Sequence, residues 1–374
     1  MVAVAYSDGV EMSKKKVFVA MSGGVDSSVA AALLRDDGYE VVGVTMCFSI
    51  EHPDSRRPSC CGVDGIQDAQ RVTQILGIPH YVLDFAGDIR EFIIDPFVRE
   101  YLRGRTPNPC VRCNQYLKFG TLYRKVMGMG ADFLATGHYL RNEFSSQTGQ
   151  FVLKTAVDRK KDQSYFLYNI PKAFLPRLLF PLGGMTKDEV RRVAARYGLN
   201  TAAKPESQDI CFVPETGYKQ FIRDRVGEEA FIPGEFIDHR GEVVGRHQGI
   251  ANYTIGQRQK LGLALGYPAY VYHIDADRHV VRVGPRECLF SRACAAREVC
   301  WVGPSPMKEN MEVQARIRYN APRIKAFLRD LREDRLRVVF DEPQMAVTPG
   351  QSVVFYQGEV ILGGAVIDES SQED

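Results

Sequence analysis

Apolar and polar positions in the first half of the chain follow a repeating order of buried strand and amphipathic helix. Short runs that are almost wholly apolar predict strands covered on both faces, and longer runs with apolar residues three or four apart predict helices. Strands alternating with helices at this spacing predict a doubly wound α/β fold with a parallel sheet. The predicted strands are 14–19, 39–46, 80–85 and 133–136, and the predicted helices are 29–34, 64–76, 89–102, 114–127 and 186–197.

From about Gly217 the helical spacing fades and short alternating runs take its place. Residues 236–244 and 270–283 are each typical of a β-hairpin. Regular short strands separated by Pro and Gly indicate a small β-barrel in the last part of the chain. The strands predicted for the barrel are 312–319, 323–328, 335–340, 352–356 and 360–367.

The length of 374 residues exceeds what a single hydrophobic core usually supports, so several domains are expected. We expect a frayed extension at 1–15, an α/β domain at 16–215, a central β-rich domain at 216–285 and a barrel domain at 286–374. No apolar run approaches the roughly 20 residues of a membrane span, and the first residues resemble no targeting segment. Thr186 and Glu189 form a capping-box pattern, and the helix that follows them is interpreted as scaffold.

The loop Ser22-Gly-Gly-Val-Asp-Ser27 lies where the first strand gives way to the first helix. Gly23 and Gly24 permit a tight turn whose amides point at an anion on the helix N-terminus, which favours a phosphate site over an ordinary Gly-rich turn. The lysine of a Walker loop is absent. The pattern instead resembles the pyrophosphate loop of N-type ATP pyrophosphatases, which cleave ATP between its α and β phosphates and adenylate a substrate oxygen.

Charge and cysteine content add two observations. Net charge is only +2, but residues 99–125 carry seven Lys or Arg against one acid and residues 286–337 carry twelve against seven. Such clusters fit either a solvated face or a nucleic-acid partner.

The nine cysteines include the adjacent pair Cys60-Cys61 and a Cys-x-x-Cys from Cys110 to Cys113. Without a secretory signal, these cysteines favour metal or redox chemistry over structural disulfides. Cys60 and Cys61 have no assigned role.

Six motifs in one order resemble the tRNA-specific 2-thiouridylases from about Lys16 onward. They are the loop at 22–27, Thr106-Pro-Asn-Pro with Cys113-Asn, Ala135-Thr-Gly-His138-Tyr, Lys161-Asp-Gln-Ser-Tyr-Phe-Leu167, Asp209-Ile-Cys211-Phe and Asn252-Tyr-Thr-Ile-Gly-Gln-Arg. The resemblance implies an ATP-dependent tRNA sulfurtransferase of the cytoplasm, which replaces O2 of the wobble uridine in the anticodon stem-loop with sulfur. A persulfide donor protein or cysteine desulfurase relay would supply the sulfur, and Mg²⁺ near Asp26 would accompany ATP.

The same resemblance assigns roles to individual residues. Cys211 would carry the persulfide, and Cys113 would be the nucleophile that resolves it through a transient disulfide. The basic surroundings of Arg112 would favour the thiolate form, which is the reactive one. ATP would be bound by Ala20, Met21, Ser22, Gly23, Gly24, Val25, Asp26, Ser27, Met46 and Gly137. The tRNA or its target base would be contacted by Asn108, Pro109, Cys110, His138, Lys161, Asp162, Gln163, Arg318, Tyr319 and Gln351. Arg318 and Tyr319 alone would also fit an ordinary strand pair.

Many relatives have Asp where this chain has Cys110, and a thiol cannot play the part of that carboxyl group in the same way. Cys110, Cys113 and Cys211 make a set of three thiols, so an iron–sulfur cluster with an open iron site is an alternative route to the same product. Zinc is less expected, because a closed tetrahedral site needs a fourth ligand. The motifs would also fit a different N-type ATP pyrophosphatase, such as a tRNA 2-thiocytidine or amidating synthetase, or a catalytically idle tRNA-binding or sulfur-carrier module.

Overall fold

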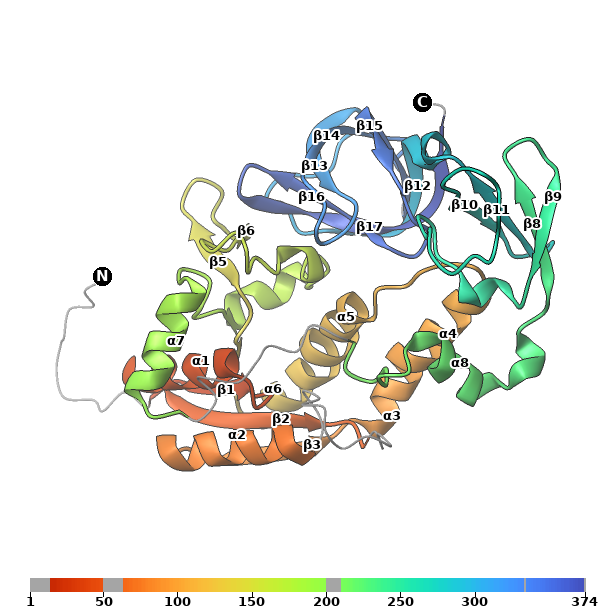
Figure 1. Ribbon diagram of the computed structural model, residues 1–374. Coiled ribbons are helices and arrows are strands. Elements are labelled where there is room, and N and C mark those ends of the chain that lie inside the picture. The colour runs from red at the N-terminus through yellow and green to blue at the C-terminus, as the bar shows by residue number, and fades with distance from the viewer. Residues whose placement is uncertain (1–13, 50–62, 200–209, 333, 373–374) are drawn as a thin grey trace, which may run out of the picture.

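The computed structural model describes residues 14–49, 63–199, 210–332 and 334–372, which form three β-sheets with most of the helices around the first. Figure 1 shows the parallel sheet and its helices in the lower part of the view, a β-barrel at the top and a smaller sheet at the right. Cys60, Cys61 and Asp209, together with most of the expected N-terminal extension, lie outside the described residues. Among the described helices, none has the length and apolar character needed to cross a bilayer.

The first sheet is parallel and has the order β3-β2-β1-β4-β7. Side chains of β1 point alternately to its two faces, so Val17 and Val19 enter one hydrophobic core while Phe18 enters another. The predicted doubly wound sheet is confirmed. Its strands are β1 (Lys16–Ala20), β2 (Glu40–Cys47), β3 (His80–Asp84), β4 (Phe133–Thr136) and β7 (Leu178–Leu179).

Helices cover both faces of this sheet. Buried residues of α1 (Val25–Asp36), α2 (Val63–Leu76) and α7 (Lys187–Arg196) share the core of Val17. On the other face lie α3 (Ala86–Ile89), α4 (Asp95–Leu102), α5 (Pro109–Arg112) and α6 (Tyr123–Gly128).

Two helices of this second face contain π-helical turns. The first is Arg90–Ile94, between α3 and α4, and the second is Cys113–Leu122, between α5 and α6. The rings of Phe92 and Tyr116 stack between the two segments with centroids 5.6 Å apart. The predicted helices 89–102 and 114–127 are therefore present, but a π-helix bonds residue i to i+5 and changes the direction in which their side chains point.

The central part consists of α8 (Tyr218–Val226) and a four-stranded sheet of order β10-β11-β8-β9. Phe236, Val271 and Val281 form its small core. The two predicted hairpins are confirmed as the antiparallel pairs β8–β9 and β10–β11. The strands are β8 (Gly234–Asp238), β9 (Val243–His247), β10 (Tyr270–Asp275) and β11 (Val280–Gly284).

Six strands close the barrel in the order β12-β15-β14-β13-β16-β17, because β17 also pairs with β12. The five predicted strands are confirmed, whereas β12 was not predicted. The strands are β12 (Phe290–Trp301), β13 (Met311–Arg316), β14 (Ile324–Arg329), β15 (Arg335–Met345), β16 (Ser352–Gln357) and β17 (Val360–Ser371).

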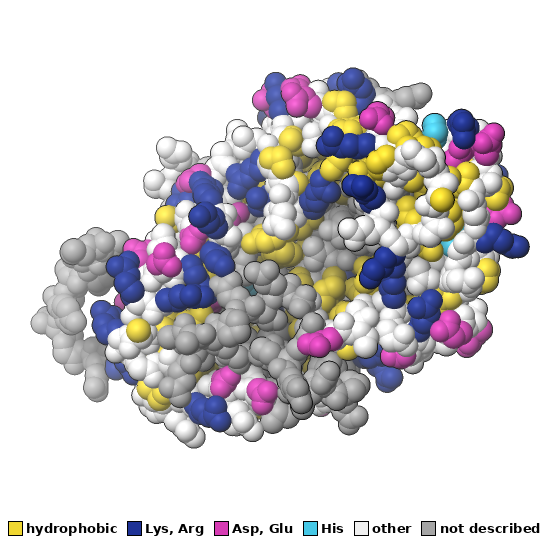
Figure 2. Space-filling model, viewed as in Figure 1, with side chains coloured by type: hydrophobic (Ala, Val, Ile, Leu, Met, Phe, Trp, Pro, Cys, Tyr) yellow, Lys and Arg dark blue, Asp and Glu magenta, His cyan; other side chains and the backbone are white. Residues whose placement is uncertain are grey.

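A hairpin from the first half of the chain extends the barrel sheet. It comprises β5 (Leu140–Ser145) and β6 (Gln150–Thr155), and β6 pairs with β17 at Lys154 and Val360. Figure 2 shows Lys and Arg side chains gathered along the face that runs from this hairpin to the barrel. Short 3₁₀ turns at Ser164–Phe166, Lys172–Arg177, Glu228–Ala230, Ile250–Asn252 and Arg286–Leu289 complete the described helices.

Candidate nucleotide and thiol site

The loop between β1 and α1 is a tight turn that only glycine permits at position 23. Gly23 has φ +71°, and a Cβ there would lie 2.4 Å from the carbonyl oxygen of Gly65 in α2. The Ser22 amide donates to the hydroxyl of Ser27 at 3.2 Å, which folds the loop over the start of α1. Gly24 is the N-cap of α1, and no side chain caps it. Backbone donors at such a helix start suit a phosphate group.

Asp26, in the first turn of α1, is bound by two side chains from distant parts of the chain. The Nζ of Lys187 lies 2.8 and 2.9 Å from its carboxylate oxygens, and the Tyr139 hydroxyl donates to Oδ1 at 2.8 Å. The capping box of Thr186 and Glu189 is present and fixes Lys187 at the start of α7. Sequence reasoning interpreted α7 as scaffold and missed this ion pair, although the capping box marked where the helix begins.

The predicted ATP residues after β2 and β4 lie at the same edge of the sheet as the loop. Ala20 pairs with Val44 on one side and with Thr136 on the other, and the Met21 amide donates to the Val44 carbonyl. Gly137 packs directly on the first turn of α1, where a Cβ would lie 2.6 Å from the backbone of Asp26 and Ser27. Met46, near the end of β2, is buried. The carboxyl ends of parallel strands are where α/β folds bind ligands.

His138 follows Gly137, and its ring makes two hydrogen bonds. Nδ1 lies 2.8 Å from the Thr136 hydroxyl oxygen, and Nε2 lies 3.3 Å from the Nζ of Lys118. Burial first, and then the charge of Lys118, lower the pKa of His138 well below its usual value, so the ring is neutral. Because an ammonium only donates, Nε2 accepts and the proton resides on Nδ1.

The two predicted catalytic cysteines are half-buried, and their chain neighbours pack on the same helical run. Arg112, before Cys113, donates from Nε to the carbonyl oxygen of Phe92 at 3.2 Å. Phe212, after Cys211, packs with its ring centroid 5.2 Å from that of Phe97. Residues 90–102 therefore anchor both cysteine segments, although 98 positions separate the cysteines in the sequence.

The loop before Cys113 presents the remaining residues of its motif. The Asn108 side chain accepts from the Val111 amide at 3.3 Å and caps α5, Pro109 is buried within α5, and Cys110 is exposed. Within the ranges that the structure describes, no three His, Cys, Asp or Glu side chains gather as a metal site. The three cysteines proposed as cluster ligands are inside those ranges, so their arrangement does not fit a shared cluster.

Residues 161–163 form a link between the α/β domain and the barrel. Asp162 is buried, accepts from the Ser164 hydroxyl at 2.7 Å and pairs with Arg316 and Arg323 of the barrel at 3.7 and 4.0 Å. Gln163 accepts from the Tyr139 amide at 2.9 Å, and Lys161 is half-buried. Two of these three predicted tRNA residues therefore also hold protein segments together.

The predicted tRNA residues of the barrel lie against the cysteine-bearing side of the α/β domain. The ring of Tyr319 packs 4.7 Å from that of Phe166, whose carbonyl accepts from the Asn114 side chain. Arg318 is half-buried. Gln351 donates from Nε2 to the carbonyl of Thr106 at 2.7 Å. The structure thus brings Tyr319 and Gln351 to the two ends of the segment that contains Cys110 and Cys113.

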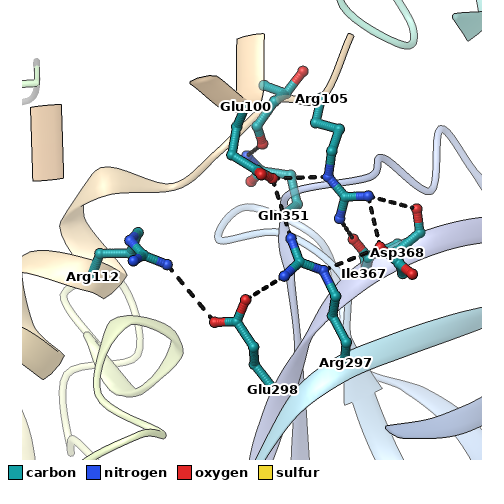
Figure 3. Close-up of polar contacts among 9 residues, drawn as sticks. Glu100, Arg105, Arg112, Arg297, Glu298, Gln351, Ile367 and Asp368 are labelled. Atoms are coloured by element: carbon teal, nitrogen blue, oxygen red, sulfur yellow. Dashed lines mark hydrogen bonds and ion pairs between the residues drawn. The ribbon is translucent and has the colours of Figure 1, made fainter. Parts of the chain in front are cut away.

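Ion pairs of Arg105 and Arg112 join this part of the chain to the barrel, as Figure 3 shows. Arg105 binds Glu100 at 2.8 Å, Asp368 of β17 at 2.7 Å and the Ile367 carbonyl at 3.0 Å. We call this set the loop–barrel ion pairs. Its further members are Arg297, which pairs with Glu100, Asp368 and Glu298, and Arg112, which pairs with Glu298 at 3.8 Å.

Replacing Arg105 is expected to destabilise the chain measurably. Arg105→Gln leaves two mostly buried carboxylates with fewer donors, so the free energy of unfolding should fall by about 2 kcal/mol. Arg71, which is 60% exposed and makes one ion pair, is the matched control, and Arg71→Gln should cost less than about 0.5 kcal/mol. Urea unfolding of both variants measures the difference, and equal midpoints would show that the loop–barrel ion pairs add little.

Three family models match consecutive parts of the chain. The model described as "tRNA methyl transferase HUP domain" matches residues 15–215. The models described as "tRNA methyl transferase PRC-barrel domain" and "Aminomethyltransferase beta-barrel domain" match residues 219–285 and 291–367.

Curated relatives match over nearly their whole length. The tRNA-specific 2-thiouridylase MnmA of Carboxydothermus hydrogenoformans is 50% identical over 96% of this chain and 99% of its own. Those of Heliobacterium modesticaldum and Geotalea uraniireducens are 46% and 47% identical over 95% and 96% of this chain, and over 92% and 96% of their own. The chain therefore belongs to the tRNA-specific 2-thiouridylase family.

Proposed function

We propose that this chain is an ATP-dependent tRNA sulfurtransferase that converts the wobble uridine of tRNA to 2-thiouridine. One observation carries the proposal: the loop with the N-type pyrophosphatase pattern lies at the sheet edge that also presents His138 beside the helix of Cys113. A uridine oxygen is a poor leaving group, so its activation by a nucleotide and its replacement by sulfur must share one site. The family relationship specifies tRNA as the substrate.

The reaction divides into an adenylation and a sulfur transfer. In the first, uridine O2 attacks the α-phosphorus of MgATP, an O–P bond forms and pyrophosphate leaves with the electron pair of the broken bond. In the second, the terminal sulfur of a Cys211 persulfide attacks C2, the C2–O bond breaks and AMP leaves. The Cys113 thiolate then attacks Sγ of Cys211, which forms a disulfide and releases the thiocarbonyl. A thiol reductant must reduce that disulfide before the next cycle.

The described residues support the adenylation step through the loop and its neighbours. The α1 start and the Ser22–Ser27 amides would receive the departing pyrophosphate, since backbone donors at a helix start favour anions. Asp26 lies in the first turn of α1, and its carboxylate would help to hold Mg²⁺, in competition with its ion pair to Lys187. Met46 and Gly137 would border the nucleotide.

The tRNA would contact the basic face between the β5–β6 hairpin and the barrel. To reach the loop edge the wobble base must leave the anticodon stack, as target bases do in other base-modifying enzymes. Asn108, Pro109, Cys110 and His138 would border the extruded base, while Lys161, Arg318, Tyr319 and Gln351 would contact the anticodon loop by charge and stacking. A persulfide donor protein would load Cys211, in the cytoplasm.

The iron–sulfur route is not favoured, because the three cysteines do not gather as a ligand set among the described residues. The persulfide route needs only Cys113 and Cys211. A different N-type pyrophosphatase activity is not favoured either, since the curated relatives described above, which match over 95–96% of the chain, are named tRNA-specific 2-thiouridylases.

The test supplies purified chain with ATP, unmodified tRNA and a persulfide donor, followed by nucleoside mass analysis. We expect 2-thiouridine that requires both ATP and the donor, together with pyrophosphate release. Formation of 2-thiocytidine or of an amidated nucleoside would assign a different pyrophosphatase. Binding of tRNA without either product would identify an idle binding module.

A further inference from the structure

A second lysine, Lys118, points toward the nucleotide edge from the helix that begins with Cys113. It lies five residues after Cys113 in the π-helical segment Cys113–Leu122. Residues five apart are hydrogen-bonded neighbours in a π-helix, whereas in an α-helix they lie on different sides. The π-helical turn therefore directs the Lys118 side chain toward the same side of the helix as the predicted nucleophile.

The partner of Lys118 places its ammonium close to the nucleotide loop. Nζ lies 3.3 Å from Nε2 of His138. His138 follows Gly137, which packs on the backbone of Asp26 and Ser27. The Lys118 ammonium thus lies between the thiol-bearing helix and the loop.

The charge of Lys118 has no acidic partner among the residues that the structure describes. Its one side-chain hydrogen bond there is to His138, which is neutral because burial and the lysine charge lower the pKa of the ring. Lys187 differs, because the carboxylate of Asp26 neutralises it. A half-buried ammonium without a counter-ion is costly, and an anionic ligand would remove that cost.

We propose that Lys118 is a phosphate-binding residue of this site, whose ammonium binds the α-phosphoryl group of ATP and then of the adenylated uridine. This inference rests on the proposed function. In adenylation the charge on the α-phosphoryl oxygens is redistributed as pyrophosphate leaves. In sulfur transfer the same group gains charge as the C2–O bond breaks and AMP departs. A fixed ammonium stabilises both transition states, since it acts where charge develops.

His138 serves as the positioning residue for this ammonium. Its Nδ1–H donates to the Thr136 hydroxyl, which leaves the Nε2 lone pair directed at Lys118. The lysine is held by a neutral acceptor, so its full positive charge remains available to the phosphate.

The test compares Lys118→Met and Lys118→Arg with wild type in three assays: tRNA-dependent exchange of pyrophosphate into ATP, 2-thiouridine formation, and persulfide loading of Cys211 followed by mass analysis. Lys118→Met should lower the first two rates about 100-fold, the loss expected for one oriented donor to a transition state. In both of these assays Lys118→Arg should be at least about tenfold faster than Lys118→Met, because arginine restores the positive charge. Persulfide loading should stay unchanged, because no phosphate takes part in it.

Lys125→Met is the matched control, since Lys125 is exposed on the same helical run and its ammonium bonds the Asp84 carbonyl instead. It should leave all three readouts at the wild-type level. The proposal is overturned if Lys118→Met exchanges pyrophosphate and thiolates within about twofold of wild type, or if it loses persulfide loading and thermal stability together. A wild-type chain that makes no 2-thiouridine would instead overturn the proposed function.

Discussion

The Cys113→Ser and Cys211→Ser variants are expected to form 2-thiouridine about 1,000-fold more slowly than wild type, because a serine hydroxyl can neither carry nor resolve a persulfide. Exchange of pyrophosphate into ATP should continue in both, since adenylation needs no thiol. The double variant should be no slower than either single variant, as residues that act in one step are not additive. Nucleoside mass analysis and the exchange assay measure the two reactions separately.

Cys288→Ser is the control for this experiment, because Cys288 is also half-buried but lies between the central sheet and the barrel. It should retain wild-type thiolation. Thiolation that survives in both Cys113→Ser and Cys211→Ser would remove the persulfide mechanism and leave only the adenylation half of the proposal.

Gly137→Ala is expected to lower the rates of pyrophosphate exchange and of thiolation together, each by at least about 100-fold. The added methyl would lie 2.6 Å from the backbone of Asp26 and Ser27, which must then move away from β4. Real Cβ atoms do not approach backbone this closely, and neither neighbour is a flexible side chain that could yield. The start of α1 would lose its position against the sheet edge, and with it the alignment of the phosphate donors.

The control for Gly137→Ala is Gly128→Ala at the end of α6, where the added methyl group would have no atom within 4 Å. Helix propensity makes that change neutral or slightly stabilising. Both assays should therefore match wild type for Gly128→Ala, and circular dichroism should show both variants folded. Wild-type exchange by Gly137→Ala would mean that the packing of Gly137 on α1 does not position the nucleotide.

The parts of this structure that the sequence predicts are those set by local pattern. The apolar run before Ser22 and the glycines after it are enough to place a strand, a turn and a helix, because each depends on neighbours within a few positions. The hairpins of the central sheet follow from alternation in the same way. Strand β12 escaped prediction because its sequence contains three Ala and only one β-branched residue, Val299, whereas β-branched residues usually mark strands.

Features that depend on distant contacts could not be predicted. The ion pair of Lys187 with Asp26 joins positions 161 residues apart, and nothing near Lys187 in the sequence distinguishes it from a surface lysine. The π-helical turn that begins at Cys113 has the composition of an ordinary helix. The pairing of β6 with β17 likewise requires the closed barrel to exist before it can be recognised.

The loop–barrel ion pairs have a consequence for the order in which the enzyme is completed during synthesis. Arg105 and Arg112 are translated long before their partners Glu298 and Asp368. Domains generally fold from the N-terminus as the chain emerges from the ribosome. The nascent α/β domain can therefore make the contacts of the thiol segment with residues 90–102 early, while the ion pairs that join this segment to the barrel form only after β17 has been made. The last part of the chain to be translated thus completes the surroundings of a segment that the first half has already folded.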